Sequence, residues 1–452
     1  MKKINYIGLF VYLYLIIFIF LFSYTLYQAE FIHGGNQFSY YYKYYLIFLL
    51  GILFWSLVLF LGEKRKLQFV ILSTGIIFLL YFYEIVRFYA PVILKSIPNK
   101  SQLNEKTKYD VIQDLKINQG LNAVPSIFPS ALLKKNWINE DVDIFPLGGV
   151  SNATTVFCKE GNEFSIYKSD RYGFNNPDTE WDKEIFWLLV GDSFTQGSCV
   201  QQGEDFASQI RLFTNKSAIS LGMSGNGPLI ELATLKEYTL KKNPKIVLWF
   251  YFERNDLEDL SLEKLNSIFR NYLKEGFSQN LYSKQKEINN QLIEYINLAK
   301  QEVVNKRDQL NESSEKFLSF KKIIRLKILR DKTSLDRGLD FGVDPLFEKI
   351  IANANNFVNS WNGKLFFVYL PDKERYSARK AKDDNYLKRA QVINLIKNLN
   401  IPIIDIHKDF FLKQDDPISF YAHRVYGHYS PEGYAKISEV IINKVNEIYP
   451  YK

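Results

Sequence analysis

The chain contains one segment, IFWLLVGDSFTQG at residues 185–197, in which a wholly apolar run ends abruptly at a glycine. The run before Gly191 is short and has no polar face, which predicts a strand that is buried on both sides. Strands of this kind belong to parallel sheets covered by helices on both faces. The residues after the run therefore lie at the carboxyl end of a strand, where open α/β sheets bind their ligands.

The rest of the C-terminal half repeats this pattern. Further apolar runs predict strands at 218–222, 245–252, 364–370 and 402–406, and helical patterns at 204–213, 228–240 and 430–445 separate or follow them. Pro228 and Pro431 suit the first turn of a helix, and Ser430 can cap the last one. Strands that alternate with helices predict an α/β fold with a doubly wound parallel sheet.

The N-terminus predicts a membrane anchor. Residues 4–28 carry no charge and are long enough to span a bilayer, and they lack the short apolar core and cleavage site of a secretory signal. A second span is expected at 45–61. A third is expected at 69–89, where Glu84 and Arg87 can pair near the membrane face. The alternative for this third segment is a helix of the globular domain.

Basic residues predict the orientation of the anchor. Lys2 and Lys3 precede the first span, and a tight turn with Lys64, Arg65 and Lys66 separates the second from the third. Because bases favour the cytoplasmic side, three spans place residues from 93 onward outside the cytoplasmic membrane. Without the third span, that side would reverse.

The domain organisation follows from these patterns. We expect an anchor at residues 1–92, an irregular, turn-rich lead-in at 93–180, and a catalytic domain at 181–452 with a helical insertion at about 257–345. Within the insertion, residues 317–332 mix apolar and basic side chains. They predict either a helix lying on anionic lipid or a cap helix with a solvated basic face, and we favour the second.

Composition excludes several classes of partner. The 452 residues are 47% hydrophobic and carry a net charge of +8. However, the sequence has no basic tract with interleaved aromatics and no zinc-finger spacing that would argue for nucleic-acid binding.

The two cysteines, Cys158 and Cys199, lie far apart, and the 4 histidines do not cluster, so we expect no metal and no cofactor. A disulfide and two free thiols both remain open for the cysteines.

Four segments at expected strand or helix ends carry candidate catalytic residues. Ser193 stands in GDSFTQG, Gly225 in SLGMSGNGP, Asn255 in YFERND and His428 in YGHYSPEGY. A serine needs a base such as imidazole to become a good nucleophile. A glycine N–H and an asparagine amide can stabilise the oxyanion that forms when the serine attacks.

These residues, in the order Ser, Gly, Asn, His, make the chain resemble the SGNH (GDSL-like) hydrolase family over roughly residues 185–447. The resemblance implies a flavodoxin-like three-layer α/β/α fold. It implies Ser193 as nucleophile, His428 as general base, and an oxyanion hole formed by the Ser193 and Gly225 N–H groups and the Asn255 amide.

One position departs from the family pattern. The family usually has an aspartate three residues before the histidine, to orient the imidazole, and here that residue is Val425. Either a backbone carbonyl holds the ring or another acid substitutes. Asp416 is the nearest acid before the histidine and Asp405 ends the last strand, so we expect Asp416 to be the replacement. The departure bears on the level of activity rather than on the fold.

We therefore expect a serine-dependent ester hydrolase or O-acyltransferase that acts outside the cytoplasmic membrane, on acyl or acetyl groups of a cell-surface glycan. One alternative is a lipid esterase, which the bilayer anchor would suit. The other is a catalytically weak carbohydrate-binding or assembly component. The expected partners are an acylated small molecule, glycan or lipid as substrate, and the lipid bilayer through the N-terminal helices.

Overall fold

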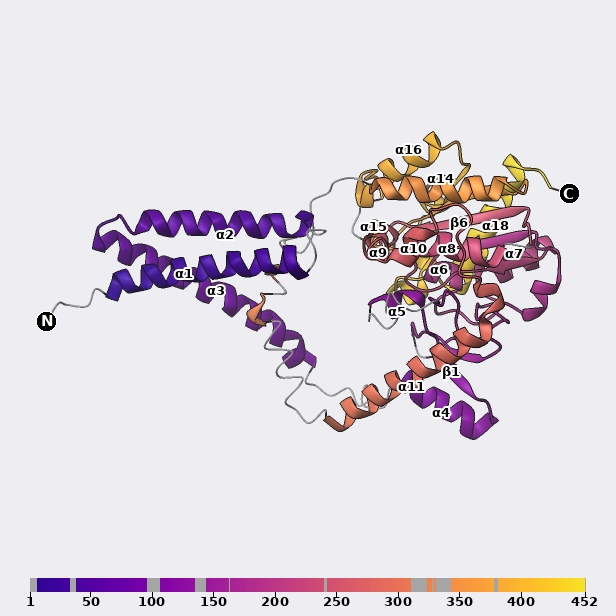
Figure 1. The fold of residues 1–452 in the computed structure, drawn as a ribbon, viewed down its shortest axis with the longest axis horizontal. Helices are drawn as coiled ribbons and strands as arrows, with labels where there is room; N and C mark the ends of the chain where they lie inside the picture. The colour runs from indigo at the N-terminus through magenta and orange to yellow at the C-terminus, as the bar shows by residue number, and fades with distance from the viewer. Residues whose placement is uncertain are drawn as a thin grey trace. The chain divides into compact units, whose positions relative to one another are not determined.

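The computed structural model describes residues 6–32, 38–95, 106–134, 144–161, 163–239, 242–309, 323–326, 329–330, 343–377 and 381–451. These residues belong to two compact units (Figure 1). The first comprises Met1–Glu105 and Val303–Phe341, and the second comprises Lys106–Glu302 and Gly342–Lys452. The long insertion of the catalytic domain is thus divided between them.

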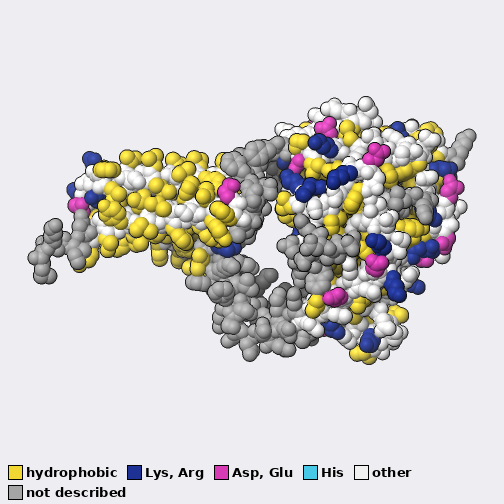
Figure 2. All heavy atoms as spheres, viewed as in Figure 1, with side chains coloured by type: hydrophobic (Ala, Val, Ile, Leu, Met, Phe, Trp, Pro, Cys, Tyr) yellow, Lys and Arg dark blue, Asp and Glu magenta, His cyan; other side chains and the backbone are white. Residues whose placement is uncertain are grey.

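The first unit is built on three long helices, α1 (Tyr6–Tyr27), α2 (Phe38–Val58) and α3 (Glu63–Lys95), with a short π-helix, η1 (Gln28–Ile32), after α1. Three segments, Tyr6–Phe31, Tyr40–Val58 and Glu63–Arg87, are long and apolar enough to cross a membrane. Their outer surface is largely hydrophobic (Figure 2). The third predicted span is therefore a long apolar helix of this unit.

Aromatic and aliphatic side chains join these helices. The ring of Tyr14 stacks on that of Trp55 with 4.4 Å between centroids, and the Tyr14 and Thr74 hydroxyls lie 2.7 Å apart.

The basic residues between the second and third spans lie in a different place from the one expected. Because α3 begins at Glu63, residues 64–66 form its first turn rather than the connecting turn.

Part of the insertion packs on α3. The hydroxyl of Tyr81 donates to the Ile324 carbonyl at 3.1 Å, and the N–H of Leu329 donates to the Glu84 carboxylate at 3.0 Å. Glu84, expected to pair with Arg87, thus receives a backbone donor. Most of residues 317–332, predicted as a basic helix, lie outside the described residues.

The second unit contains a parallel sheet of five strands in the order β5-β4-β6-β7-β8. The strands are β4 (Trp187–Val190), β5 (Ala218–Ser220), β6 (Ile246–Phe252), β7 (Lys364–Leu370) and β8 (Ile403–Asp405). Their order doubles back at β4, as in doubly wound folds. All five predicted strands are present, and the predicted α/β fold class is confirmed.

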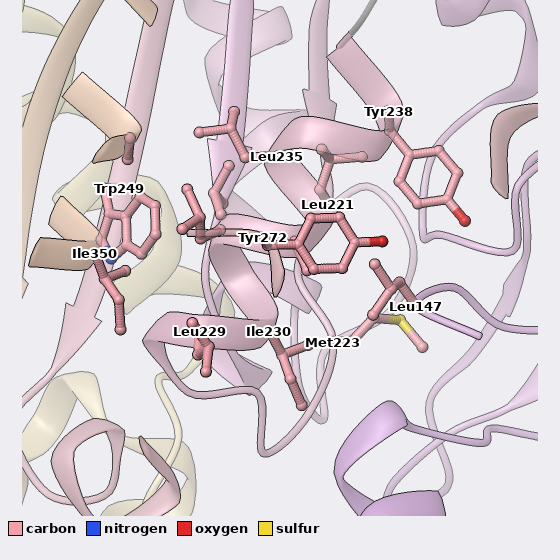
Figure 3. Packing of buried hydrophobic residues seen from close by; sticks show 14 of the residues in the cluster. Leu147, Leu221, Met223, Leu229, Ile230, Leu235, Tyr238, Trp249, Tyr272 and Ile350 are labelled. Carbon is pink, nitrogen blue, oxygen red and sulfur yellow. The ribbon is translucent and has the colours of Figure 1, made fainter. Parts of the chain in front are cut away.

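Helices cover both faces of this sheet (Figure 1). One face packs against α8 (Pro228–Thr239), α14 (Pro345–Asn359) and α16 (Arg389–Asn398). The other packs against α7 (Phe206–Thr214) and α18 (Pro431–Ile448). Alternate strand residues enter the two cores: Leu188 and Val190 face the first, and Trp187 and Leu189 face the second. Figure 3 shows part of the first core around Trp249.

The lead-in is more regular than expected. It forms α4 (Lys108–Gln119), α5 (Pro129–Lys134), the 3-10 helix η3 (Asp178–Asp182), and a small sheet of β1 (Ala123–Pro125), β2 (Thr154–Val156) and β3 (Ile166–Lys168). These strands have three residues each, too few to show a period in the sequence. β2 and β3 form an antiparallel hairpin that becomes important at the active site.

The remaining elements are short or belong to the insertion. They are α6 (Ser193–Gln196), α9 (Asp256–Glu263), α10 (Ser267–Asn271), η4 (Leu281–Ser283), α11 (Gln285–Gln309), α15 (Glu374–Ser377), η5 (Tyr386–Lys388), α17 (Ile406–Asp409), η6 (Phe411–Lys413), η7 (Pro417–Phe420) and η8 (Ala422–Arg424). The start of the insertion continues the second unit, because Ile288 and Leu292 of α11 join its core.

Candidate active site

Ser193 lies at the turn between β4 and the short helix α6. Asp192 caps this helix by accepting a hydrogen bond from the N–H of Phe194 at 2.9 Å. The turn requires a glycine at position 191, because a Cβ there would lie 2.2 Å from the Thr195 hydroxyl oxygen. At Gly197 the backbone takes φ = +83° and ends the helix. The turn therefore leaves the Ser193 hydroxyl at the carboxyl edge of the sheet.

His428 meets this serine from the loop before α18. Its Nε2 lies 3.0 Å from the Ser193 Oγ. The loop is fixed at both sides: the N–H of Ala422 donates to the His428 carbonyl at 2.9 Å, and Ser430 caps α18 by accepting from Gly433. The imidazole also packs beside the ring of Phe194, at 4.9 Å between centroids. The two expected catalytic side chains are thus in direct hydrogen-bond contact.

Glu160 holds the other side of the imidazole. Its Oε1 lies 2.7 Å from His428 Nδ1, and the two side chains are 14% and 25% exposed. When Nδ1–H donates to this carboxylate, Nε2 keeps a lone pair and accepts the Ser193 hydroxyl proton. Glu160 comes from the β2–β3 hairpin of the lead-in, and the sequence analysis missed it.

The expected replacement acid, Asp416, does not reach the site. Its carboxylate accepts from the Arg424 guanidinium at 2.6 Å, and both side chains are at least half exposed. Asp405 caps α17 and pairs with the buried Arg389. Val425, which occupies the family's usual acid position, points to solvent with 69% exposure. The prediction of Asp416 is therefore wrong, because a local arginine engages it and Glu160 occupies its expected place.

A disulfide joins the Glu160 hairpin to the segment after the nucleophile. Cys158 and Cys199 are bonded, with 5.1 Å between their Cα atoms, which settles the alternative left open by the sequence. Cys158 lies two residues before Glu160 in the sequence, and Cys199 lies six residues after Ser193. A pairing of the two cysteines would therefore have indicated that Glu160 lies near Ser193. One ligand atom each of Glu160, Cys199 and His428 lie within 4.8 Å of one another. However, a disulfide sulfur offers no thiolate to a metal.

Gly225 lies in the turn after β5, close to α6. Its φ is +71°, and a Cβ there would lie 2.7 Å from the Ser130 hydroxyl. The preceding residue, Ser224, donates its N–H to the Gln196 side-chain oxygen at 2.8 Å, which ties the turn to the nucleophile's helix. Both the backbone conformation and the close approach require glycine here.

Asn255 follows β6 and lies beside the nucleophile turn. Its amide donates to Asp259 at 2.8 Å and approaches Asp192 at 3.4 Å. Burial raises the pKa of Asp192, against the opposing effects of the Phe194 N–H, the His428 charge and the Asn255 amide. The amide and the Ser193 hydroxyl thus both approach the Asp192 carboxylate, and two acidic side chains fix the position of the amide.

Further carboxyl groups lie buried beneath this region. Burial raises the pKa of Asp256 and of Glu231 well above their usual ranges, and nearby acids add to the shift. A raised pKa favours the neutral carboxylic acid.

The fold and these residues define a class. A doubly wound parallel sheet with the serine turn after β4 and the histidine loop before the last helix is the arrangement of the SGNH, or GDSL-like, hydrolases, which this chain resembles. No family model and no curated protein matches the sequence.

Several solved structures are similar to this chain. A lipase/acylhydrolase from Enterococcus faecalis is 11% identical with a TM-score of 0.34, and the match covers 59% of this chain and 99% of that one. The acetyl xylan esterase AlAXEase is 15% identical with a TM-score of 0.31, covering 58% and 100%. A GDSL-like lipase from Bacteroides thetaiotaomicron is 12% identical with a TM-score of 0.31, covering 59% and 90%.

Proposed function

We propose that this chain is a membrane-anchored serine ester hydrolase with Ser193 as nucleophile, His428 as general base and Glu160 as the acid that orients the imidazole. One observation carries the proposal. A continuous chain of hydrogen bonds runs from Ser193 Oγ to His428 Nε2 at 3.0 Å, and from His428 Nδ1 to Glu160 Oε1 at 2.7 Å. This is the arrangement that nucleophile, base and orienting group take in serine hydrolases.

The proposed reaction has two halves. His428 takes the Ser193 proton as Oγ attacks the ester carbonyl, and the imidazolium then protonates the departing alcohol as the acyl–oxygen bond breaks. In the second half, His428 takes a proton from water or from an acceptor hydroxyl, which attacks the acyl-enzyme and frees the serine. We assign the oxyanion to the N–H groups of Ser193 and Gly225 and to the amide of Asn255.

The acceptor decides between hydrolysis and transfer. We propose a glycan-borne acyl or acetyl ester as substrate, because Ser193 and His428 are only partly buried and can meet a polymer at the surface. A polymer hydroxyl in place of water would make the same site an O-acyltransferase. Glu160 supplies the acid that was missing from the sequence pattern, so nothing in the site now favours a weak binding component over an enzyme.

We further propose that the catalytic unit lies outside the cytoplasmic membrane. The Cys158–Cys199 disulfide suits an oxidising compartment. Three apolar helices with a basic cluster at residues 64–66 agree with that side. The bilayer is the partner of the helical unit.

The test is fluorophosphonate labelling of the full-length protein in its membrane fraction. We expect the wild type to label and both Ser193→Ala and His428→Ala to lose labelling. Ser261→Ala is a matched control, because the Ser261 hydroxyl donates within its own helix, to the Glu258 carbonyl at 2.6 Å. Folded wild type that fails to label would refute an activated serine. Labelled protein would then be tested on acetyl and longer acyl esters with and without glycan acceptors.

A further inference from the structure

We propose that the Cys158–Cys199 disulfide is a redox-modification site that sets catalytic rate by holding Glu160 against His428. Oxidised protein has the acid in place, and reduced protein does not. The inference rests on the proposed function for the role of Glu160, and it adds a covalent positioning element that the reaction itself does not require.

The hairpin geometry makes the disulfide the last fixed point before Glu160. The β2–β3 ladder ends where Phe157 donates to the Ser165 carbonyl at 2.9 Å and Ser165 donates to the Cys158 carbonyl at 2.8 Å. Glu160 lies two residues beyond this rung, in the loop. The cross-link is therefore at the base of the acid's own loop.

The position of Glu160 is costly to maintain. Its Oε1 bonds to His428, but its Oε2 is buried and has no hydrogen-bond partner among the described residues. A carboxylate oxygen without a partner loses its hydration when buried. The acid would regain that hydration by turning toward water, so the loop has to be restrained for the contact to persist.

Gln201 also attaches to the described part of this loop through hydrogen bonds. Gln201 contacts the Phe164 carbonyl at 3.4 Å and the Ile166 N–H at 3.3 Å, both in exposed positions. The ring of His423 lies against Gly161, whose φ of +110° suits only a glycine. Neutral hydrogen bonds of this kind contribute little each in water. The covalent bond is thus the strongest restraint on the loop.

The other half of the disulfide lies next to the nucleophile. Cys199 follows the helix that begins at Ser193, and its sulfur lies within 4.8 Å of ligand atoms of both Glu160 and His428. The bond therefore connects the segment carrying the acid to the segment carrying the serine. Reduction leaves the Ser193–His428 contact in place and removes only the tie to Glu160.

The chemistry of the switch is thiol–disulfide exchange. Both cysteines are partly exposed, so a dithiol reductant can reach them. Its thiolate attacks one sulfur, the S–S bond breaks, and its second thiol completes the exchange, which leaves two protein thiols and an oxidised reductant. The chain has 2 cysteines in all, so this bond is the sole target of the reductant.

The experiment is a double-mutant cycle on the full-length protein in detergent. We expect the Cys158→Ser/Cys199→Ser pair, or reduction followed by alkylation, to lower kcat tenfold or more with little change in KM. In a Glu160→Gln background the same treatments should lower kcat less than twofold further, because the acid is already lost. The double-serine variant should not respond to reductant. Equal losses in both backgrounds, or none in either, would overturn the proposal.

A second measurement does not depend on activity. With ¹⁵N-labelled histidine, the Nδ1–H that His428 donates to a carboxylate should give a strongly downfield proton signal in oxidised wild type. Glu160→Gln should abolish this signal, and reduction should abolish it too, while the His407 ring beside Tyr376 serves as an internal reference. An inactive wild type that shows this redox response would refute the proposed function alone. A signal that persists after reduction would refute the switch.

Discussion

Replacing Glu160 with glutamine should cost the enzyme about three orders of magnitude in kcat. Glutamine keeps the size of the side chain but removes the charge that faces the imidazolium when His428 holds the serine proton. Glu160 Oε1 lies 2.7 Å from His428 Nδ1, and both side chains are partly shielded from water. Two unit charges about 4 Å apart interact by about 4 kcal/mol at an effective dielectric constant of about 20. At about 1.36 kcal/mol per tenfold change in rate, this corresponds to about 10³.

The assay is hydrolysis of a chromogenic acetyl ester by full-length protein in detergent, with Ser193→Ala as the background. KM should change little, because the charge is needed only after the proton moves. Asp416→Asn is the matched control. This variant removes the carboxylate that was expected from the sequence to orient the imidazole and that pairs with Arg424 in the structure. The kcat of Asp416→Asn should stay within about twofold of the wild-type kcat.

Two results would refute this reasoning. If Glu160→Gln retained wild-type kcat, the 2.7 Å contact would have no catalytic role. If Asp416→Asn lost activity instead, the sequence-based assignment would be restored and the position of the hairpin in solution would have to differ. Thermal unfolding of both variants separates a lost contact from a lost fold.

Three other perturbations test the surrounding structure. Burial lowers the pKa of His407 from 6.5 to about 3, so the neutral side chain stabilises the fold above pH 6.5 and this contribution is lost as the pH falls. Between pH 6.5 and 5 we expect the free energy of unfolding to fall by about 2 kcal/mol, measured by thermal or denaturant unfolding. The His407→Gln variant should show a flatter dependence of this free energy on pH. Gly225→Ala adds a Cβ 2.7 Å from a serine hydroxyl at positive φ and should lower kcat tenfold or more. Gly203→Ala, with positive φ but open space around it, should leave kcat unchanged. Glu253→Ala removes the carboxylate that pairs with the fully buried Arg375 guanidinium and should destabilise the unit by about 3–5 kcal/mol, seen as a lower melting temperature.

The sheet was predictable because its signals are local. A buried parallel strand shows as an apolar run between turn residues, and IVLWFYF of β6 is buried at every position. The positions of Ser193 and His428 were predictable for the same reason, since Ser193 follows such a run directly and His428 precedes a helix with a serine cap. Each of these assignments depends on residues that are close neighbours in the sequence.

The acid was not predictable in this way. Glu160 is 268 residues from His428 in the chain, and it lies in a loop between two strands of three residues each. No spacing rule connects a hairpin in the lead-in to a loop before the last helix. Asp416 was chosen because it was near in sequence, but its nearest partner in space is Arg424. Only the cysteine pair carried long-range information, and its pairing was one of two open alternatives.

The position of Glu160 also changes where the catalytic unit begins. The lead-in was expected to be an irregular segment that packs on a domain starting at 181, but it supplies the acid, one cysteine of the disulfide and part of the core. Phe145 and Phe174 of this region are buried in the first core cluster. Asp170, equally buried, accepts from the Trp181 indole at 2.7 Å and from the Asn176 amide at 2.8 Å. We therefore propose that the catalytic unit comprises Lys106–Glu302 and Gly342–Lys452, and that a chain begun at 181 would lose both its orienting acid and much of its stability.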